Sequence, residues 1–532
     1  MLAIASTLLG LTTAANLLAT PVNGVFDSWR ELMKQYRPWN HDQSFLLPPS
    51  PHDWLPEGHL AYFILDIVKV LDLGKIIRAI DAKDARGERP YSPYMMVALL
   101  LYAYCVGVFS SRRIERATYE DVAFRVIAGS QNPDHTSICE FRRVHLDALA
   151  GLFKQTVQLC QAAGLVKLGR VAIDGSKLEA NASKHKAMSY ERMQEQEKRL
   201  EQEIADLLDR AEQADRADDE RFGVGQREED LPAELRRREG RLEKIRAAMG
   251  TLEAQAARTR IATLEEQATR NEKSAETHPD ATERKRAEAR AKKRREQIEK
   301  LSNSSSDDDE GTSGGLTAQN LETHQTPATP EGLPHPKAQY NFTDPESRIQ
   351  ERGGAFLQGY NAQATVDEEA QVVVAQAVTN LQPDNSHLLP MIEQTRDNCG
   401  AMPEVALGDA GYWKPENVTD AEELGVDPYL SVSRTKHGAG PPGDHTEDGN
   451  NDEKAKDAKA KMRAKLQTDE GRAHYARRKA IVEPVFGQIK ECRGFRRFLL
   501  RGLRKVNAEW SLVTATHNLL KLFRHQTAGA PG

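Results

Sequence analysis

The spacing of apolar residues separates a helical N-terminal part from the rest of the chain. Apolar side chains between Leu60 and Leu71 recur at helical spacing, and Pro93 opens a second apolar stretch that runs through Val108. That stretch is too short, and too closely flanked by polar helices, to span a membrane. Residues 34–165 are therefore predicted to form an all-helical N-terminal domain.

Short strand-like runs appear further along the chain. They lie at residues 171–173, 359–366, 371–378, 405–408 and 428–432. The second and third runs are separated by the turn Asp367-Glu368-Glu369 and are predicted to form a β-hairpin. A closing helix over 509–523 carries apolar residues on or near one face. The fold class expected from these elements is α/β, with a mixed sheet flanked by helices that is built from 166–186 and 340–525.

A charged insertion separates the first strand from the others. Leu200, Ile204 and Leu207 follow helical spacing, and Leu235, Leu242 and Met249 repeat every seven residues. Residues 187–301 are therefore predicted to form an inserted antiparallel helical hairpin, partly coiled coil. Residues 302–339, which begin with runs of Ser and Asp, are expected to be a disordered linker. Two interpretations of the insertion stay open, a spacer without chemistry and an arm for dimerisation or DNA clamping.

Charge is distributed unevenly, which changes what the composition implies. The net charge of −6 argues against a nucleic-acid partner only if charge is uniform, yet 471–525 holds thirteen Lys or Arg against three Glu. A local basic face of this kind is what a phosphate backbone attracts. The five cysteines are scattered and show no zinc-ligand spacing, which suits a reducing compartment.

The first residues resemble a signal peptide only superficially. Residues 1–33 are largely apolar but begin without the Lys or Arg that opens a signal, and Met33 is a second possible start. We interpret this leader as a start-site artefact or a loose helix. The protein is then expected to be cytoplasmic, without a membrane partner, and associated with the bacterial nucleoid.

Three acidic residues are the candidates for chemistry. Asp174 and Asp409 each follow a short apolar run, where α/β folds commonly place ligands, and Glu483 is a lone acid in a basic stretch. Phosphodiester cleavage is served by two Mg²⁺ ions about 4 Å apart, and carboxylates are the hard ligands that hold them. Asp174 would bridge both ions, with Asp409 and Glu483 completing one site each. Pro484 is expected to start or kink a helix directly after Glu483.

Other acids and motifs are weaker candidates. Asp344 and Asp384 stand beside Pro or Asn, and Asp367 opens the turn Asp367-Glu368-Glu369; all three are interpreted as turn-formers, with Asp384 the alternative to test if Asp409 fails. The sequence has no phosphate-cradling Gly-rich loop and no Ser, Cys or His nucleophile constellation, so no nucleotide cofactor is expected. A further helix after Asp134, capped by Thr136 or Ser137, would carry Arg142 and Arg143 on an exposed face. It would either read DNA or be a solvated helix in a bundle.

Several motifs together resemble a known family, the bacterial insertion-sequence transposases of the IS-eleven-eighty-two type, allied to the IS-four and IS-five groups. The first motif is Val171-Ala172-Ile173-Asp174-Gly175-Ser176-Lys177-Leu178-Glu179. The later ones are Gly359-Tyr360-Asn361-Ala362-Gln363, then Asp409-Ala410-Gly411-Tyr412-Trp413, then Glu483-Pro484-Val485-Phe486-Gly487-Gln488-Ile489-Lys490. The resemblance also takes in Arg37-Pro38-Trp39 and the helical region from Tyr91 to Arg143.

The resemblance implies an RNase-H-like catalytic core of the DDE class. The implied triad is Asp174, Asp409 and Glu483, using Mg²⁺ or, in its place, Mn²⁺. Related groups carry a tyrosine-arginine-glutamate-lysine signature, which Tyr475, Glu483 and Lys490 match, while its second position holds Lys479 beside Arg478. DNA contacts are expected from the following residues: Tyr475, Arg478, Lys479, Lys490, Arg493, Arg496, Arg497, Arg142 and Arg143.

The function expected is DNA transposition. The protein would cut at terminal inverted repeats and join the ends to target DNA as a homodimer or higher multimer, with residues 34–165 binding the DNA ends. Two alternatives remain: a metal-dependent nuclease that never joins strands, and a non-catalytic DNA-binding protein derived from a transposase.

Overall fold

The computed structural model describes residues 53–82, 90–222, 233–302, 321–433 and 453–528. The expected leader 1–33 and the motif Arg37-Pro38-Trp39 lie outside these ranges. From Trp54 onward the chain forms one compact unit.

The first part of this unit is entirely helical, as expected. Its helices are α3 (Leu60–Val70), α4 (Gly74–Asp81), α5 (Pro93–Cys105), α6 (Ser111–Glu120), α7 (Val122–Ile127), α8 (His135–Val144) and α9 (Leu146–Ala162). Helix α5 starts at Pro93, is buried from Met95 to Cys105, and packs against α3, α7 and α17 (Leu503–Ala528). The apolar stretch is therefore a core helix. Among the described residues, no helix combines the length and apolar character needed to span a membrane.

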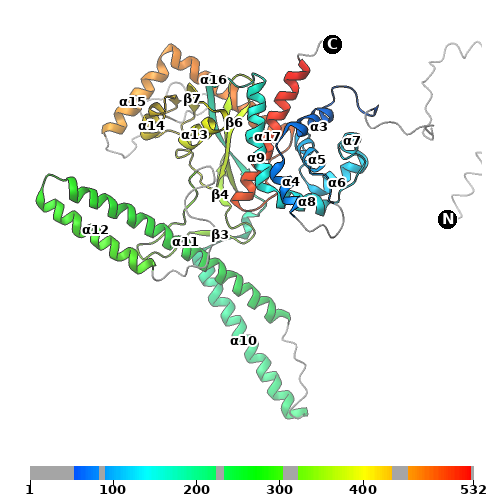
Figure 1. The fold of residues 1–532 in the computed structure, drawn as a ribbon. Coiled ribbons are helices and arrows are strands. Elements are labelled where there is room, and N and C mark those ends of the chain that lie inside the picture. Colours follow the sequence, from blue (N-terminus) through cyan, green and yellow to red (C-terminus); the bar gives the residue numbers. More distant parts are fainter. Residues whose placement is uncertain (1–52, 83–89, 223–232, 303–320, 434–452, 529–532) are drawn as a thin grey trace, which may run out of the picture. The chain divides into compact units, whose positions relative to one another are not determined.

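A six-stranded mixed sheet forms the centre of the second part (Figure 1). Its strands are β1 (Arg170–Glu179), β4 (Arg348–Arg352), β5 (Ala355–Asp367), β6 (Val373–Thr379), β7 (Val405–Gly408) and β8 (Asp427–Leu430). The order is β4-β5-β1-β7-β8, with β6 also paired to β5. Strand β5 is antiparallel to β1 and β6, whereas β7 is parallel to β1 and β8. The predicted hairpin is confirmed as β5 and β6.

Helices flank this sheet. They are α13 (Leu388–Cys399), α14 (Pro415–Glu423), α15 (Glu453–Gln467), α16 (Asp469–Gly487) and α17. Helix α16 packs on β1, β5, β7 and β8, and α17 packs on β6, α9 and α5. Strand β6 is buried at every residue, so both of its faces are covered. A helical N-terminal region followed by a mixed sheet with flanking helices fits an RNase-H-like core.

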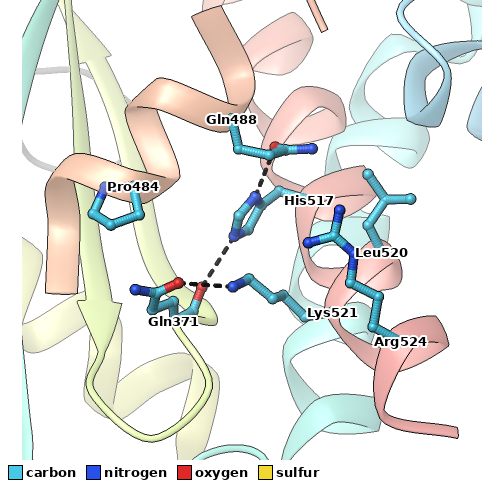
Figure 2. A pocket seen from close by; sticks show the side chains of 7 residues that line it. All are labelled: Gln371, Pro484, Gln488, His517, Leu520, Lys521 and Arg524. Carbon is cyan, nitrogen blue, oxygen red and sulfur yellow. Dashed lines mark hydrogen bonds between the residues drawn. The ribbon is translucent and has the colours of Figure 1, made fainter. Parts of the chain in front are cut away.

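Helix α16 begins at Asp469 and continues through Pro484, so this proline does not start a helix after Glu483. Proline leaves the carbonyl of Ala480, four residues earlier, without its helical donor. The side-chain amide of Gln371 replaces that donor at 2.9 Å. Gln371 has φ +58° in the β5–β6 turn, and it accepts hydrogen bonds from His517 and Lys521 of α17 (Figure 2). The turn between β5 and β6 thus stabilises α16 at its proline. A π-helical segment, Gln488–Cys492, continues the chain directly after α16.

The insertion contains three long helices. After η2 (Lys184–Lys186) and β2 (Ala187–Ser189) come α10 (Tyr190–Phe222), α11 (Ala233–Thr277) and α12 (Ala281–Ser302), and β3 (Gln339–Asn341) closes it by pairing with β2. Helix α11 packs against both α10 and α12 (Figure 1). Glu203 forms an ion pair with Arg238, and the earlier Glu197 forms one with the later Arg246. This order shows that α10 and α11 are antiparallel.

The expected disordered linker over 302–339 is corrected for its second half. Leu321 is 0% exposed and Thr326 3% exposed, and the Thr326 hydroxyl donates to Gln255 of α11 at 2.7 Å. The segment after Leu321 is therefore packed against the fold. Residues 303–320 lie outside the described part of the chain.

Candidate active site

Two neighbouring interior strands, β1 and β7, bring the candidate aspartates side by side toward the carboxyl end of β7. Strands β1 and β7 pair in parallel register up to Ala172 and Leu407. Two residues further on, Asp174 and Asp409 occupy the next equivalent positions, just where β7 ends at Gly408. The expectation that Asp409 follows a strand is confirmed. Asp174 lies inside its strand instead, because the other edge of β1 stays paired with β5 beyond this point.

The environment of Asp174 disfavours its negative charge. Burial and the nearby charge of Asp409 raise the pKa of this carboxyl from 3.8 to about 6. Two contacts oppose the rise: the Arg478 guanidinium lies 3.4 Å from Oδ2, and the Gly175 N–H donates to Oδ1 at 2.8 Å. The two aspartates thus form an acidic pair that the surrounding protein neutralises only in part.

A third aspartate lies next to this pair. The Oδ1 of Asp384 accepts hydrogen bonds from the side-chain amides of Asn361 and Gln363, both at 2.7 Å. A Cβ atom on Gly175 would be 3.0 Å from the same oxygen, and one on Gly411 would be 3.3 Å from Asp384 Oδ2 and 2.9 Å from the Oδ1 of Asp409. Asp384 therefore packs against both aspartate loops, and the prediction that it merely forms a turn is wrong.

The turn prediction holds for Asp367, whereas the carboxylate of Asp344 bonds residues far away in the sequence. Asp344 is buried and accepts hydrogen bonds from the Tyr360 hydroxyl and the Gly502 N–H. Asp367 accepts from the backbone N–H groups of Leu168 and Glu369 at the end of β5. Asp367 therefore stabilises a turn, and Asp344 links β5 to the segment before α17.

Helix α16 borders the acidic pair. Arg478 is buried on it beside Asp174, and Lys490, just beyond its end, donates to Ser176 Oγ at 3.0 Å. Glu483 is exposed, and its helical spacing puts it on the side that also carries Tyr475 and Lys479. Within the described ranges, no three acidic, His or Cys side chains converge closely enough to hold a metal ion. The role of Glu483 as a third ligand stays a prediction.

Comparison with known families gives two matches that follow each other along the chain. Residues 49–144 match a family model described as a transposase domain (DUF772), and residues 318–519 match one described as a transposase DDE domain. The chain belongs to the DDE-type insertion-sequence transposases. Searches of curated proteins and of solved structures gave no match. Asp409 and Glu483 lie within the second match; Asp174 and all three long helices of the insertion lie between the two.

Membership implies an enzyme of nucleotidyl transfer that acts on DNA, in a family that generally uses divalent metal ions. The chemistry of the two carboxylates on β1 and after β7 fits a divalent metal ion. Asp174 and Asp409 offer hard carboxylate oxygens, and the pKa of Asp174 is raised first by burial and then by the charge of Asp409. A divalent cation would offset the negative charge of this pair.

Two arginines expected to bind DNA are instead part of the transposase's interior. Arg142 is 6% exposed and donates to the Tyr104 hydroxyl, the Phe109 carbonyl and the Ser111 hydroxyl. Arg493 is also 6% exposed and donates to the Val513 carbonyl and the Thr516 hydroxyl in α17. The expectation of an exposed Arg142 is therefore wrong, and neither side chain is presented to DNA in this structure. Helix α8 is also capped by Asp134 rather than by Thr136 or Ser137.

Most of the remaining candidates lie at the surface, whereas Arg478 is buried and Lys490 half-buried. Arg143, Arg496 and Arg497 are exposed and form ion pairs with acids of the same molecule. Exposed ion pairs are weak, so a phosphate can displace the acid at little cost. Lys479 is exposed and Tyr475 half-buried, with the Arg478 guanidinium 5.9 Å from the Tyr475 ring. These five residues, together with Arg478 and Lys490, remain predicted DNA contacts.

Asp384 could have been recognised from its partners in the sequence. Asn361 and Gln363 are amide residues at alternate positions of the fully buried stretch 358–367 of β5. Buried amides require hydrogen-bond partners, and the neighbouring strand offers a glycine, Gly175, at the facing position. That pattern predicts that another polar side chain packs beside Gly175 and bonds these amides, although it does not identify that side chain.

Proposed function

We propose that this transposase cuts DNA at the ends of an insertion sequence and joins those ends to target DNA, with Asp174, Asp409 and Glu483 as its metal-binding triad. The observation that carries the proposal is the acidic pair of Asp174 on β1 and Asp409 directly after β7, in a chain of the DDE transposase family. A bound divalent cation supplies charge neutralisation at the phosphorus and an activated water or 3′-hydroxyl.

The protein's own residues would position the DNA around that pair. Arg478 lies 3.4 Å from Asp174 and opposes the rise of its pKa, so it would hold this carboxylate beside the DNA. Lys490 is anchored on Ser176, two residues from Asp174, and presents its ammonium group at the same face of the sheet. Glu483, Lys479 and Tyr475 stand on the exposed side of α16, where they can meet a duplex without unfolding of the helix.

A cleavage and joining assay tests the proposal. The purified protein is incubated with Mg²⁺ or Mn²⁺ and labelled DNA carrying the sequence that flanks its own gene. EDTA, Asp174→Asn and Asp409→Asn are the loss-of-function controls, and Asp397→Asn, with a side chain 65% exposed on α13, is the matched control. We expect cuts at a fixed end and joined products from the protein and the matched control alone. Cutting without joining would identify a nuclease, and cutting that survives Asp174→Asn would refute the triad.

Pairing of two DNA ends requires more than one active site, so we further propose a homodimer or higher multimer at the bacterial nucleoid. Analytical ultracentrifugation with and without end DNA measures this directly. A strictly monomeric complex on DNA would contradict it.

A further inference from the structure

The two ends of the charged insertion are held together where the insertion joins the strands of the sheet. It leaves from the carboxyl half of β1, the strand that carries Asp174, and returns to β4. At its root the Tyr190 N–H donates to the Ala338 carbonyl at 2.8 Å, and β2 pairs with β3. Tyr190, Met193 and Ala338 are buried there in one apolar cluster. These contacts close the base of the insertion, and we call its helical part the arm (190–302).

Charge is segregated along this arm. Helix α10 contains twelve acidic and six basic residues, whereas α12 contains nine basic and four acidic ones. Acids of α10 are used within the arm: Arg246 of α11 pairs with both Glu197 and Glu201. Most of the positive charge of α12 is not neutralised in this way, because only two of its cations, Arg286 and Arg295, form ion pairs within the described residues.

Four exposed lysines of α12 lie on one side of the helix, with the exposed acids Glu288, Glu296 and Glu299 among them, and we call them the stripe. Lys285, Lys292, Lys293 and Lys300 are exposed, and the pairs 285–286 and 292–293 repeat after seven residues, as does the step from 293 to 300. Seven residues are close to two helical turns, so the stripe stays on one side and advances about 10 Å per repeat. Ala287 and Ala291 are buried on another side of the helix, and α12 packs on α11. The stripe consequently faces away from the arm.

We propose that this stripe is a DNA-binding surface, which contacts the phosphate backbone of duplex DNA beyond the catalytic sheet without reading its sequence. Lysine ammonium groups spaced along one side of a straight helix, with no amide or aromatic readers among them, suit backbone contact rather than base recognition. The choice of DNA as the occupant rests on the proposed function. The competing occupant is the acidic α10 of a second copy, which has the complementary charge.

Binding of full-length protein to duplex DNA of arbitrary sequence tests this inference. Fluorescence anisotropy is recorded in EDTA, where no cutting occurs, over a range of salt concentrations. The test variant replaces the four stripe lysines by glutamine. The matched control removes the same charge from exposed positions on the other two arm helices: Arg192→Gln, Lys198→Gln, Arg241→Gln and Lys244→Gln.

Each lost phosphate contact lowers the slope of log K against log salt by about 0.9, so the stripe variant should show a slope smaller by up to about 3.6 and affinity at least about tenfold weaker near 0.1 M salt. The control variant should bind like the unmodified protein. Helix content by circular dichroism should stay the same in both variants, because all eight side chains are exposed.

The outcomes separate this inference from the proposed function. Equal weakening in both variants, or no weakening in either, would overturn the inference and leave the cleavage chemistry untouched. Loss of self-association without loss of DNA affinity would assign the stripe to a second copy and also overturn it. Stripe-dependent binding by a protein that never cuts or joins DNA would support the inference and contradict the proposed function.

Discussion

Asp174 carries a charge that the fold disfavours, and replacing it should therefore stabilise the protein while abolishing cleavage. The rise of its pKa from 3.8 to about 6 is equivalent to about 3 kcal/mol of lost stability at pH 8. Because the folded-state pKa is the higher one, this stability is present below pH 3.8 and is lost as the pH rises through 6. The side chain is 24% exposed, so solvent screening reduces the figure little. Asn keeps the oxygen that accepts from the Gly175 N–H.

Urea unfolding in EDTA, followed by the fluorescence of buried Trp510, measures the effect. Asp174→Asn should gain about 3 kcal/mol at pH 8 and about half as much at pH 5, where part of the wild-type carboxyl is already protonated. Glu483→Gln, an exposed change in the same proposed triad, should stay within about 0.5 kcal/mol of the wild type. Added Mg²⁺ should stabilise the wild type more than Asp174→Asn, because a ligand stabilises only the fold that binds it.

The result that would refute this reasoning is an Asp174→Asn protein no more stable than the wild type at pH 8 in EDTA. The acidic pair would then be adequately neutralised by the protein itself. A gain of equal size at pH 5 and pH 8 would point to packing rather than charge.

Three further changes probe other parts of the fold. Burial raises the pKa of Glu509 from 4.5 to about 7, so the contribution of this residue to stability should fall by about 3 kcal/mol between pH 4 and pH 8, and Glu509→Gln should remove that part of the pH dependence in urea titrations. Arg142→Ala should cost about 3–5 kcal/mol by leaving buried partners unpaired, whereas exposed Arg143→Ala should not. Equal stability of these two variants would contradict the buried role. Gly175→Ala should reduce cleavage at least about tenfold without weakening DNA binding, because its Cβ would meet Asn361 Oδ1 at 2.9 Å; Gly151→Ala, in open space, should be neutral in the same assay.

Local pattern was sufficient to predict much of the sheet. The hairpin of β5 and β6 follows from alternation on either side of a turn, and β7 follows from an apolar run that stops at Gly408. Helix α17 was expected over 509–523 and extends further at both ends, to Leu503 and Ala528. These elements are specified by residues close together in the sequence, where periodicity is strongest.

Features that depend on distant partners could not be predicted in this way. Asp174 lies inside β1 only because β5, more than 180 residues later, keeps that strand paired. Pro484 is accommodated in α16 because Gln371 supplies the missing donor from the far end of a hairpin. Arg142 resembles a surface cation in its local context, yet Tyr104 and Phe109 surround it in the folded structure. In each case tertiary contact overrides local preference.

The position of the arm also has a consequence for the order in which the protein is made. Strand β1 ends at Glu179, and its partner β5 begins to pair with it at Gly359, so translation at about 5–20 residues per second leaves β1 without that partner for roughly 10–40 s. Helices form in about a microsecond, and the arm can therefore assemble from its own local contacts while the ribosome is still working. Once Tyr190 meets Ala338, the long excursion is reduced to a short loop between the two strands. An insertion that looks like an obstacle to forming the sheet can thus bring the chain after β1 close to the chain that leads into β4 and β5.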